Sequence, residues 1–91
     1  MLNYGAVTVT SALTQILGPQ NSRRSYILAN NGSQTFYFGF DTNVTDVTGI
    51  PLVSGEKLEV GGYQDVWRGV VYGICSAATT TNVRYCEWGT Q

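Results

Sequence analysis

The side chains that could do chemistry in this chain are few, and the most versatile one is missing. Its 91 residues include no histidine, the commonest general base and metal ligand. Serine and cysteine nucleophiles need such a base within hydrogen-bond reach. The carboxylates that remain as acid–base candidates are Asp41, Asp46, Glu56, Asp65 and Glu87. A glycosidase needs two carboxylates across a cleft, which a domain this small rarely forms, so we predict no enzymatic activity.

Cys75 and Cys86 are the only cysteines. We expect residues 66–76 and 83–90 to form a hairpin, and a tip midway between the cysteines makes them face each other. Facing residues of antiparallel strands have Cα atoms ~4.5 or ~5.5 Å apart, a separation that a disulfide can span. The alternative is two buried free thiols, as is usual in a reducing compartment. Two cysteines without histidine supply too few ligands for zinc.

Asp41, Asn43 and Asp46 bring several oxygen atoms into one polar loop, residues 41–49. Oxygen ligands from loops suit Ca²⁺, but this spacing departs from the EF-hand pattern. Such residues also hydrogen-bond their own backbone in turns, and we favour that interpretation. No glycine-rich segment follows a phosphate-loop or dinucleotide pattern. We therefore expect neither a metal nor a cofactor.

Two clusters could meet a partner. Tyr63, Trp67 and Arg68 could form an exposed patch on which a sugar or a protein stacks. We favour the alternative, in which they belong to the core at the start of a strand. Arg23 and Arg24 are the only adjacent cations. We expect both to extend from the start of a strand, where one could pair with an acidic groove on a partner.

Composition narrows the classes of partner. The net charge is −1 and charged residues make up 12%, against about 25% in an average domain. Nucleic acids and membrane surfaces are therefore disfavoured. No apolar run approaches the ~20 residues of a membrane-spanning helix. The start, MLNYGAVTVTSALTQILG, lacks the pattern of a signal peptide, so we expect synthesis in a cytoplasm and disfavour a secreted adhesin or toxin-like domain.

Short alternating segments separated by turn residues predict an all-β domain. Residues 11–17 could form either a helical turn or an extended arm. An Asn31-Gly32 turn predicts a hairpin between its flanking strands. About seven short strands predict a small antiparallel β-sandwich or barrel, as a single domain with an N-terminal strand or arm (1–17) and a core (18–91). The expected strands are 5–10, 24–30, 34–40, 50–52, 56–60, 66–76 and 83–90.

The period of two within each strand predicts which side chains face the core. Phe36, Phe38 and Phe40 share one face and are the strongest core candidates. Val7 and Val9 share a face in the first strand. Pro51 predicts an edge strand, since proline cannot donate to a central ladder.

Two later strands differ in pattern. Residues 56–60 alternate, so Leu58 and Val60 should point inward and Lys57 and Glu59 outward. Residues 24–30 have a continuous apolar centre instead of an alternating one, which indicates that both faces of that strand are covered.

The order of these motifs resembles a widespread group of small structural proteins of tailed bacteriophages. The motifs are VTVTSALTQIL, NSRRSYILANNGS, FYFGFD, GIPLVSGEKLEV and VWRGVVYGICSAATTTNVRYCEW. The group includes capsid decoration (cement) proteins and small head or tail accessory domains, and the resemblance runs from about Val7 to Trp88. It implies an antiparallel β fold and a virion component. It carries no catalytic residues, and the cysteines are not a feature of the group.

The resemblance implies a decoration protein that binds the major capsid protein on the head surface. It also implies a homotrimer, made in the cytoplasm of a bacterial host, that stabilises the shell against internal DNA pressure. We expect the N-terminal arm to contact the capsid or a neighbour. The alternative is a tail or head accessory module that binds a host receptor or glycan through Tyr63, Trp67 and Trp88. The candidate partner-contact residues are Met1, Leu2, Asn3, Tyr4, Tyr63, Trp67 and Arg68.

Overall fold

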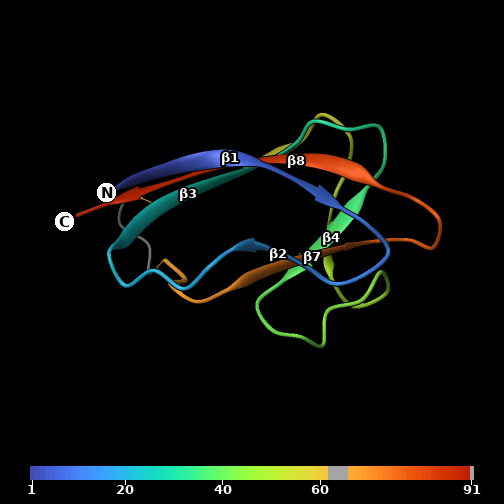
Figure 1. The fold of residues 1–91 in the computed structure, drawn as a ribbon, viewed down its shortest axis with the longest axis horizontal. Coiled ribbons are helices and arrows are strands. Elements are labelled where there is room, and N and C mark those ends of the chain that lie inside the picture. Colours follow the sequence, from blue (N-terminus) through green and yellow to red (C-terminus); the bar gives the residue numbers. More distant parts are fainter. Residues whose placement is uncertain (62–65, 91) are drawn as a thin grey trace.

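The computed structural model describes residues 1–61 and 66–90, and they form two antiparallel four-stranded sheets packed as a β-sandwich (Figure 1). The expected all-β class is confirmed. The strands are β1 (Leu2–Val9), β2 (Thr14–Leu17), β3 (Arg23–Asn30), β4 (Phe36–Gly39), β5 (Ile50–Leu52), β6 (Lys57–Val60), β7 (Val71–Cys75) and β8 (Thr81–Gly89). The described part of the chain contains no helix that could cross a membrane.

Sheet A has the strand order β1-β8-β3-β6, and sheet B has the order β2-β7-β4-β5. Figure 1 shows β1, β8 and β3 in one layer and β2, β7 and β4 in the other. Among the described strands, only β4 and β5 are both consecutive in the chain and paired with each other. Every other connection between consecutive described strands crosses from one sheet to the other, so the remaining pairs join strands that are distant in sequence.

The hairpin predicted at Asn31-Gly32 is wrong, because β3 and β4 belong to different sheets. The physical reason is the buried Asn30 side chain. Its Nδ2 donates to the carbonyl oxygens of Gln34 and Leu52, at 2.7 and 2.8 Å. Its Oδ1 accepts from the Gly32 amide at 3.1 Å and from the Thr81 hydroxyl at 2.8 Å. These bonds turn the chain across from one sheet to the other.

The predicted hairpin between β7 and β8 is also wrong. The chain turns between them, where the Thr79 amide donates to the Ser76 carbonyl at 3.1 Å and Ala78 has a positive φ of 63°. It then enters the opposite sheet. β7 lies between β2 and β4, and β8 lies between β1 and β3. Both strands are central in their sheets, with a paired strand on each side.

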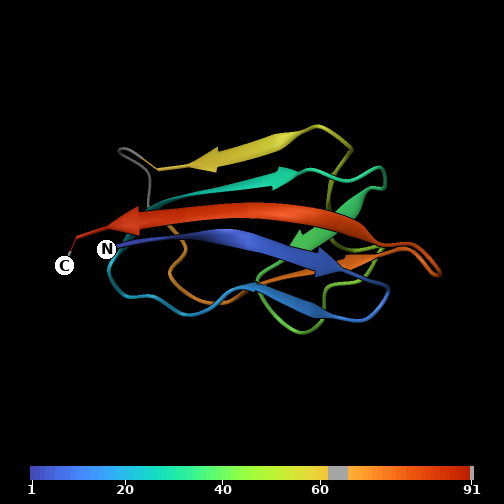
Figure 2. The same cartoon turned by 45° about the horizontal axis from the view of Figure 1, so that its top comes forward.

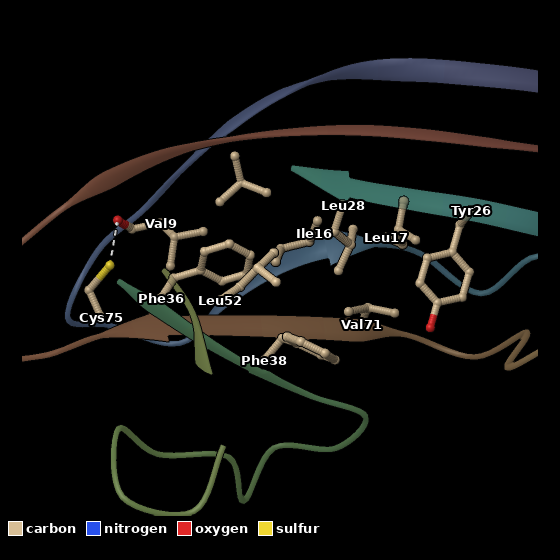
Figure 3. Close-up of a cluster of buried hydrophobic side chains, with 11 residues drawn as sticks. Val9, Ile16, Leu17, Tyr26, Leu28, Phe36, Phe38, Leu52, Val71 and Cys75 are labelled. Atoms are coloured by element: carbon tan, nitrogen blue, oxygen red, sulfur yellow. Dashed lines mark hydrogen bonds between the residues drawn. The ribbon is translucent and has the colours of Figure 1, made fainter. Parts of the chain in front are cut away.

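Apolar side chains from both sheets meet between the two layers (Figure 3). Phe36 and Phe38 are buried, as predicted, with 0% and 4% of their surface exposed. Phe40 is not a core residue, because β4 ends at Gly39 and the ring, 40% exposed, leaves the buried face. The buried members of the core are Val9, Ile16, Leu17, Tyr26, Leu28, Phe36, Phe38, Leu52, Val71, Cys75 and Val83.

The edge strands agree with the pattern analysis. Leu58 and Val60 pack against the core, and Lys57 and Glu59 are exposed. β5, which contains Pro51, is an edge strand of sheet B, as predicted.

The N-terminal residues 1–17 supply an edge to each sheet, since β1 borders sheet A and β2 borders sheet B. Of the two alternatives for residues 11–17, the structure has the extended one over β2. Val9, Ile16 and Leu17 are buried within the core.

Arg23 is fully buried, so the expectation that it extends outward is wrong; Arg24 is exposed. The pairing of β3 with β8 shifts between Arg23 and Ser25. This irregularity places Arg23 opposite Gly89 on the inner side of the sheet. The Arg23 side chain is 0% exposed and forms an ion pair with Glu87, with Nε 2.7 Å from Oε1.

The rest of the guanidinium binds main-chain carbonyls of neighbouring segments. Nη1 donates to Trp67 and Gly69 at 2.9 and 3.0 Å, and Nη2 donates to Gly18 at 2.6 Å. The guanidinium also lies 5.8 Å from the centre of the Tyr26 ring. Burial raises the pKa of the Tyr26 hydroxyl, and the positive charge of Arg23 opposes this in part. Arg23 therefore ties β3 and β8 to the segments that precede β3 and β7.

Candidate interaction surface

Three of the acid–base candidates among the described residues, Glu87, Glu56 and Asp41, are engaged locally. Glu87 forms the ion pair with Arg23, and its Oε2 accepts from the side-chain Nδ2 of Asn3 at 2.9 Å. Glu56 accepts from the Val53 amide. Asp41 accepts from the Asn43 amide at 3.0 Å, which confirms the turn interpretation for that residue. Asp65 lies outside the described residues. Within residues 1–61 and 66–90, no cluster of His, Cys, Asp or Glu is suited to a metal ion.

The two cysteines are free thiols and do not face each other. Cys75 lies in β7 and pairs with Phe36, whereas Cys86 lies in β8 between Tyr4 and Ile27. The predicted facing of the cysteines is wrong because their strands belong to different sheets. Cys75 is buried, and its Sγ donates to the Val9 carbonyl at 3.5 Å. Burial raises the pKa of the Cys75 thiol, so the reactive thiolate is scarce there.

Alkylation should distinguish the two thiols by their reactivity in the native protein. We expect iodoacetamide to modify Cys86, which is partly exposed, in the native protein at neutral pH. Cys75 should react only after unfolding, because the reagent must reach a thiolate. Intact mass spectrometry reads one added group in buffer and a second in concentrated guanidinium. A native protein that gains no group until a reductant is added would instead indicate a disulfide.

The outward side of sheet A carries an apolar patch over β1, β8 and β3. Polar residues on the same side border it, namely Ser25 in β3 and Lys57 and Glu59 in β6. Cross-strand pairing sets its rows: Leu2 beside Trp88, Tyr4 beside Cys86, and Ala6 beside Arg84, with β3 residues continuing each row. Leu2, Tyr4 and Trp88 are 68%, 73% and 40% exposed. We call this surface the outer face of sheet A. Its members are Leu2, Tyr4, Ala6, Ile27, Ala29, Arg84, Cys86 and Trp88.

A shallow groove of about 530 Å³ lies on this face, between β1, β8 and β3. Arg84 is its one charged lining residue, and its Nε donates to the Asn82 side chain at 3.0 Å. The exposed pair of Lys57 and Glu59, 3.4 Å apart, lies on the edge strand β6. The solvent face of a two-layer antiparallel sheet is normally polar. An apolar one indicates a contact surface.

The predicted N-terminal contact residues divide between two roles. Leu2 and Tyr4 project from the outer face of sheet A. The Met1 amino group donates to the Gly89 carbonyl at 2.8 Å, and Asn3 binds Glu87. Residues 1–4 are therefore held against β8.

Sequence reasoning missed Ile27 and Cys86 as surface residues. The continuous apolar centre of β3 was the signal for Ile27, since it indicated that both faces of that strand are covered.

Trp67 and Arg68 have different neighbours. The preferred interpretation of Trp67 as a core residue is wrong, because its side chain is 44% exposed. Its ring lies 5.3 Å from that of Phe40, and its indole N–H donates to the Val70 carbonyl at 2.9 Å. Arg68 is exposed and donates to the Arg23 carbonyl at 3.0 Å. Tyr63 lies outside the described residues.

Two surfaces of the described chain can thus receive a partner. One is the outer face of sheet A, and the other is the exposed pair of Phe40 and Trp67. Comparisons of this chain with protein-family models, curated proteins and solved structures gave no match.

Proposed function

We propose that this chain is a structural protein of a phage virion, a capsid decoration protein that adheres to the outer shell through the outer face of sheet A. The single observation that carries the proposal is this face, which leaves Leu2, Tyr4 and Trp88 in solvent. The resemblance in motif order supplies the partner, the major capsid protein. The small size and low charge suit a protein that contributes contact area instead of chemistry.

The stabilisation is mechanical and is multiplied by copy number. A large aromatic side chain buries ~150–250 Å² when fully covered. Each Å² of apolar surface removed from water stabilises the contact by about 25 cal/mol. Tyr4 and Trp88 have much of their surface still to bury. A protein that binds only the assembled shell shifts the equilibrium toward it. Many copies of such a contact oppose the separation of capsid subunits under DNA pressure.

The chain offers a matched pair of variants to test this role. Trp88 and Trp67 are 40% and 44% exposed, but only Trp88 lies on the outer face of sheet A. We expect Trp88→Ser to bind undecorated capsids about 30-fold more weakly, because truncating a large aromatic side chain that anchors an interface costs about 2 kcal/mol and tenfold is about 1.4 kcal/mol. Trp67→Ser should bind like the unmodified protein. Co-sedimentation with purified capsids measures both affinities.

A protein that does not co-sediment with capsids in any of these forms would favour a second candidate, a tail or head accessory module that binds a host glycan. The observation behind it is the exposed pair of Phe40 and Trp67, since sugars stack on aromatic rings beside polar groups. A hollow of about 330 Å³ near the end of β4 includes the polar residues Asp41, Asn43 and Thr48. In the Trp88→Ser protein Trp67 is the only indole. Its fluorescence should change on addition of host polysaccharide if this candidate holds.

A further inference from the structure

Within residues 1–61 and 66–90, one edge of sheet A is open along the whole length of β1. This eight-residue strand pairs with β8 on one side and with no other described strand. Figure 2 shows β1 beside β8, with β2 of the other sheet below it. An open edge presents a row of unpaired main-chain donors and acceptors.

The pairing with β8 identifies which groups point outward. Met1 and Gly89 exchange two main-chain bonds, of 2.8 and 3.0 Å. Bonded and non-bonded pairs alternate along an antiparallel ladder, so Asn3, Gly5, Val7 and Val9 bond to β8. The main-chain N–H and C=O groups that point toward the open edge are therefore those of Leu2, Tyr4, Ala6 and Thr8.

The other three edges carry features that discourage pairing. The β6 edge is four residues long and carries Lys57 and Glu59. β5 has three residues and contains Pro51. β2 has four residues, with an irregular register between Gln15 and Leu17. β1 is longer and contains neither a charged residue nor a proline, and its register against β8 is unbroken.

We propose that β1 pairs antiparallel with β1 of a second copy of this chain, across a two-fold axis. Two-fold pairing sets a strand against itself, so a charged strand would meet like charges, and β1 has none. The pairing joins the two copies of sheet A, with four strands from each, into one continuous sheet. This inference rests on the edge geometry and is independent of the proposed function.

The register centred on Gly5 satisfies all the outward groups. It pairs Leu2 with the partner's Thr8 and Tyr4 with the partner's Ala6, and each pair exchanges two main-chain bonds. Each pair also sets a large side chain beside a smaller one. The outer faces of the two copies become one surface. Because the contact is two-fold, it closes at two copies, unlike the trimer that the resemblance implies.

Sedimentation equilibrium of the complete chain tests the proposal without capsids. We expect a species of twice the 9.9 kDa chain mass. Hydrogen exchange should protect the amides of Tyr4, Ala6 and Thr8 more strongly as concentration rises. The amides of Gly5 and Val7 should be protected at every concentration, since they bond to β8. A monomer throughout, or a trimer, would overturn the proposal.

Ala6→Pro removes an N–H that points to the open edge and leaves the bonds between β1 and β8 in place. We expect the dimer dissociation constant to rise about 100-fold, through two lost hydrogen bonds and the obstruction by the two rings. Ala6→Thr keeps the N–H and is the matched control, which should dimerise normally. A folded Ala6→Pro protein that dimerises like the control would exclude this edge.

A charge exchange tests the register even if Ala6→Pro fails to fold. Tyr4→Asp with Ala6→Asp sets carboxylates opposite each other across the axis, and Tyr4→Lys with Ala6→Lys does the same with amines. Each double variant should be monomeric, and an equimolar mixture should restore the dimer. A mixture that stays monomeric, or a double variant that still dimerises alone, would contradict the register centred on Gly5.

Discussion

Replacing Arg23 with alanine should lower the free energy of unfolding by about 3–5 kcal/mol, because it leaves Glu87 as a buried charge without its partner. Arg23 is 0% exposed, and its guanidinium also satisfies the carbonyls of Gly18, Trp67 and Gly69. At roughly 4–8 °C per kcal/mol for a domain of this size, the melting midpoint should fall by more than about 12 °C. Urea unfolding followed by circular dichroism measures the loss.

The neighbouring arginine is the control. Arg24 is exposed, so Arg24→Ala should change stability by no more than about 0.5 kcal/mol. The double variant Arg23→Met with Glu87→Leu should recover much of the loss, because replacing both members of a buried ion pair with apolar groups is often close to neutral. Equal losses for Arg23→Ala and Arg24→Ala would contradict the buried position of Arg23.

The second large effect is expected at Phe36. Phe36→Ala should cost about 3–5 kcal/mol, since it removes a fully buried ring and leaves a cavity. Phe36 lies opposite Leu52 and Cys75, in the middle of sheet B. In urea unfolding, we expect the midpoint to fall while the slope of the unfolding free energy against urea concentration stays the same. That combination identifies the change as a loss of stability.

Phe40 supplies the matched control for this prediction. It has the same side chain and lies four residues later in the chain, but it is 40% exposed, and its ring pairs with those of Phe38 and Trp67. Phe40→Ala should cost about 1–3 kcal/mol, from two aromatic pairs at about 0.5–1.5 kcal/mol each, and it leaves no buried cavity. A protein of this size has about 5–15 kcal/mol of total stability, so Phe36→Leu is the milder variant if Phe36→Ala does not fold. Similar losses at Phe36 and Phe40 would mean that both rings are buried.

Binding and assembly use parts of the molecule that these substitutions leave alone. Arg23 and Phe36 lie inside the sandwich, whereas Trp88 and the β1 edge lie on its surface. Failure of capsid binding in Trp88→Ser therefore reports on the outer face of sheet A. Loss of the dimer in Ala6→Pro reports on the edge. The result of either test therefore supports or contradicts only its own proposal.

The candidate surface was only partly predictable from the sequence. Leu2 and Tyr4 were predicted as contact residues, and both lie on the outer face of sheet A. The reason given for them, a free arm, differs from the structure, in which Met1 and Asn3 are hydrogen-bonded to β8. Ile27 and Cys86 join them only because β8 inserts between β1 and β3. The apolar centre of β3 was a local signal for Ile27, but the order of the strands in the sheet has no local sequence signal.

The sequence by itself determined where most strands run and which side chains alternate inward, because period and turn residues are properties of neighbouring positions. Val9, Phe36, Phe38 and Leu58 follow from that rule. Only the tertiary structure decided which strands pair. The Asn31-Gly32 turn can close a hairpin or cross between sheets, and the buried Asn30 side chain selects the crossing. Strand partners are chosen by long-range packing, so the separation of Cys75 from Cys86 and the burial of Arg23 came from the assembled sandwich and not from any local pattern.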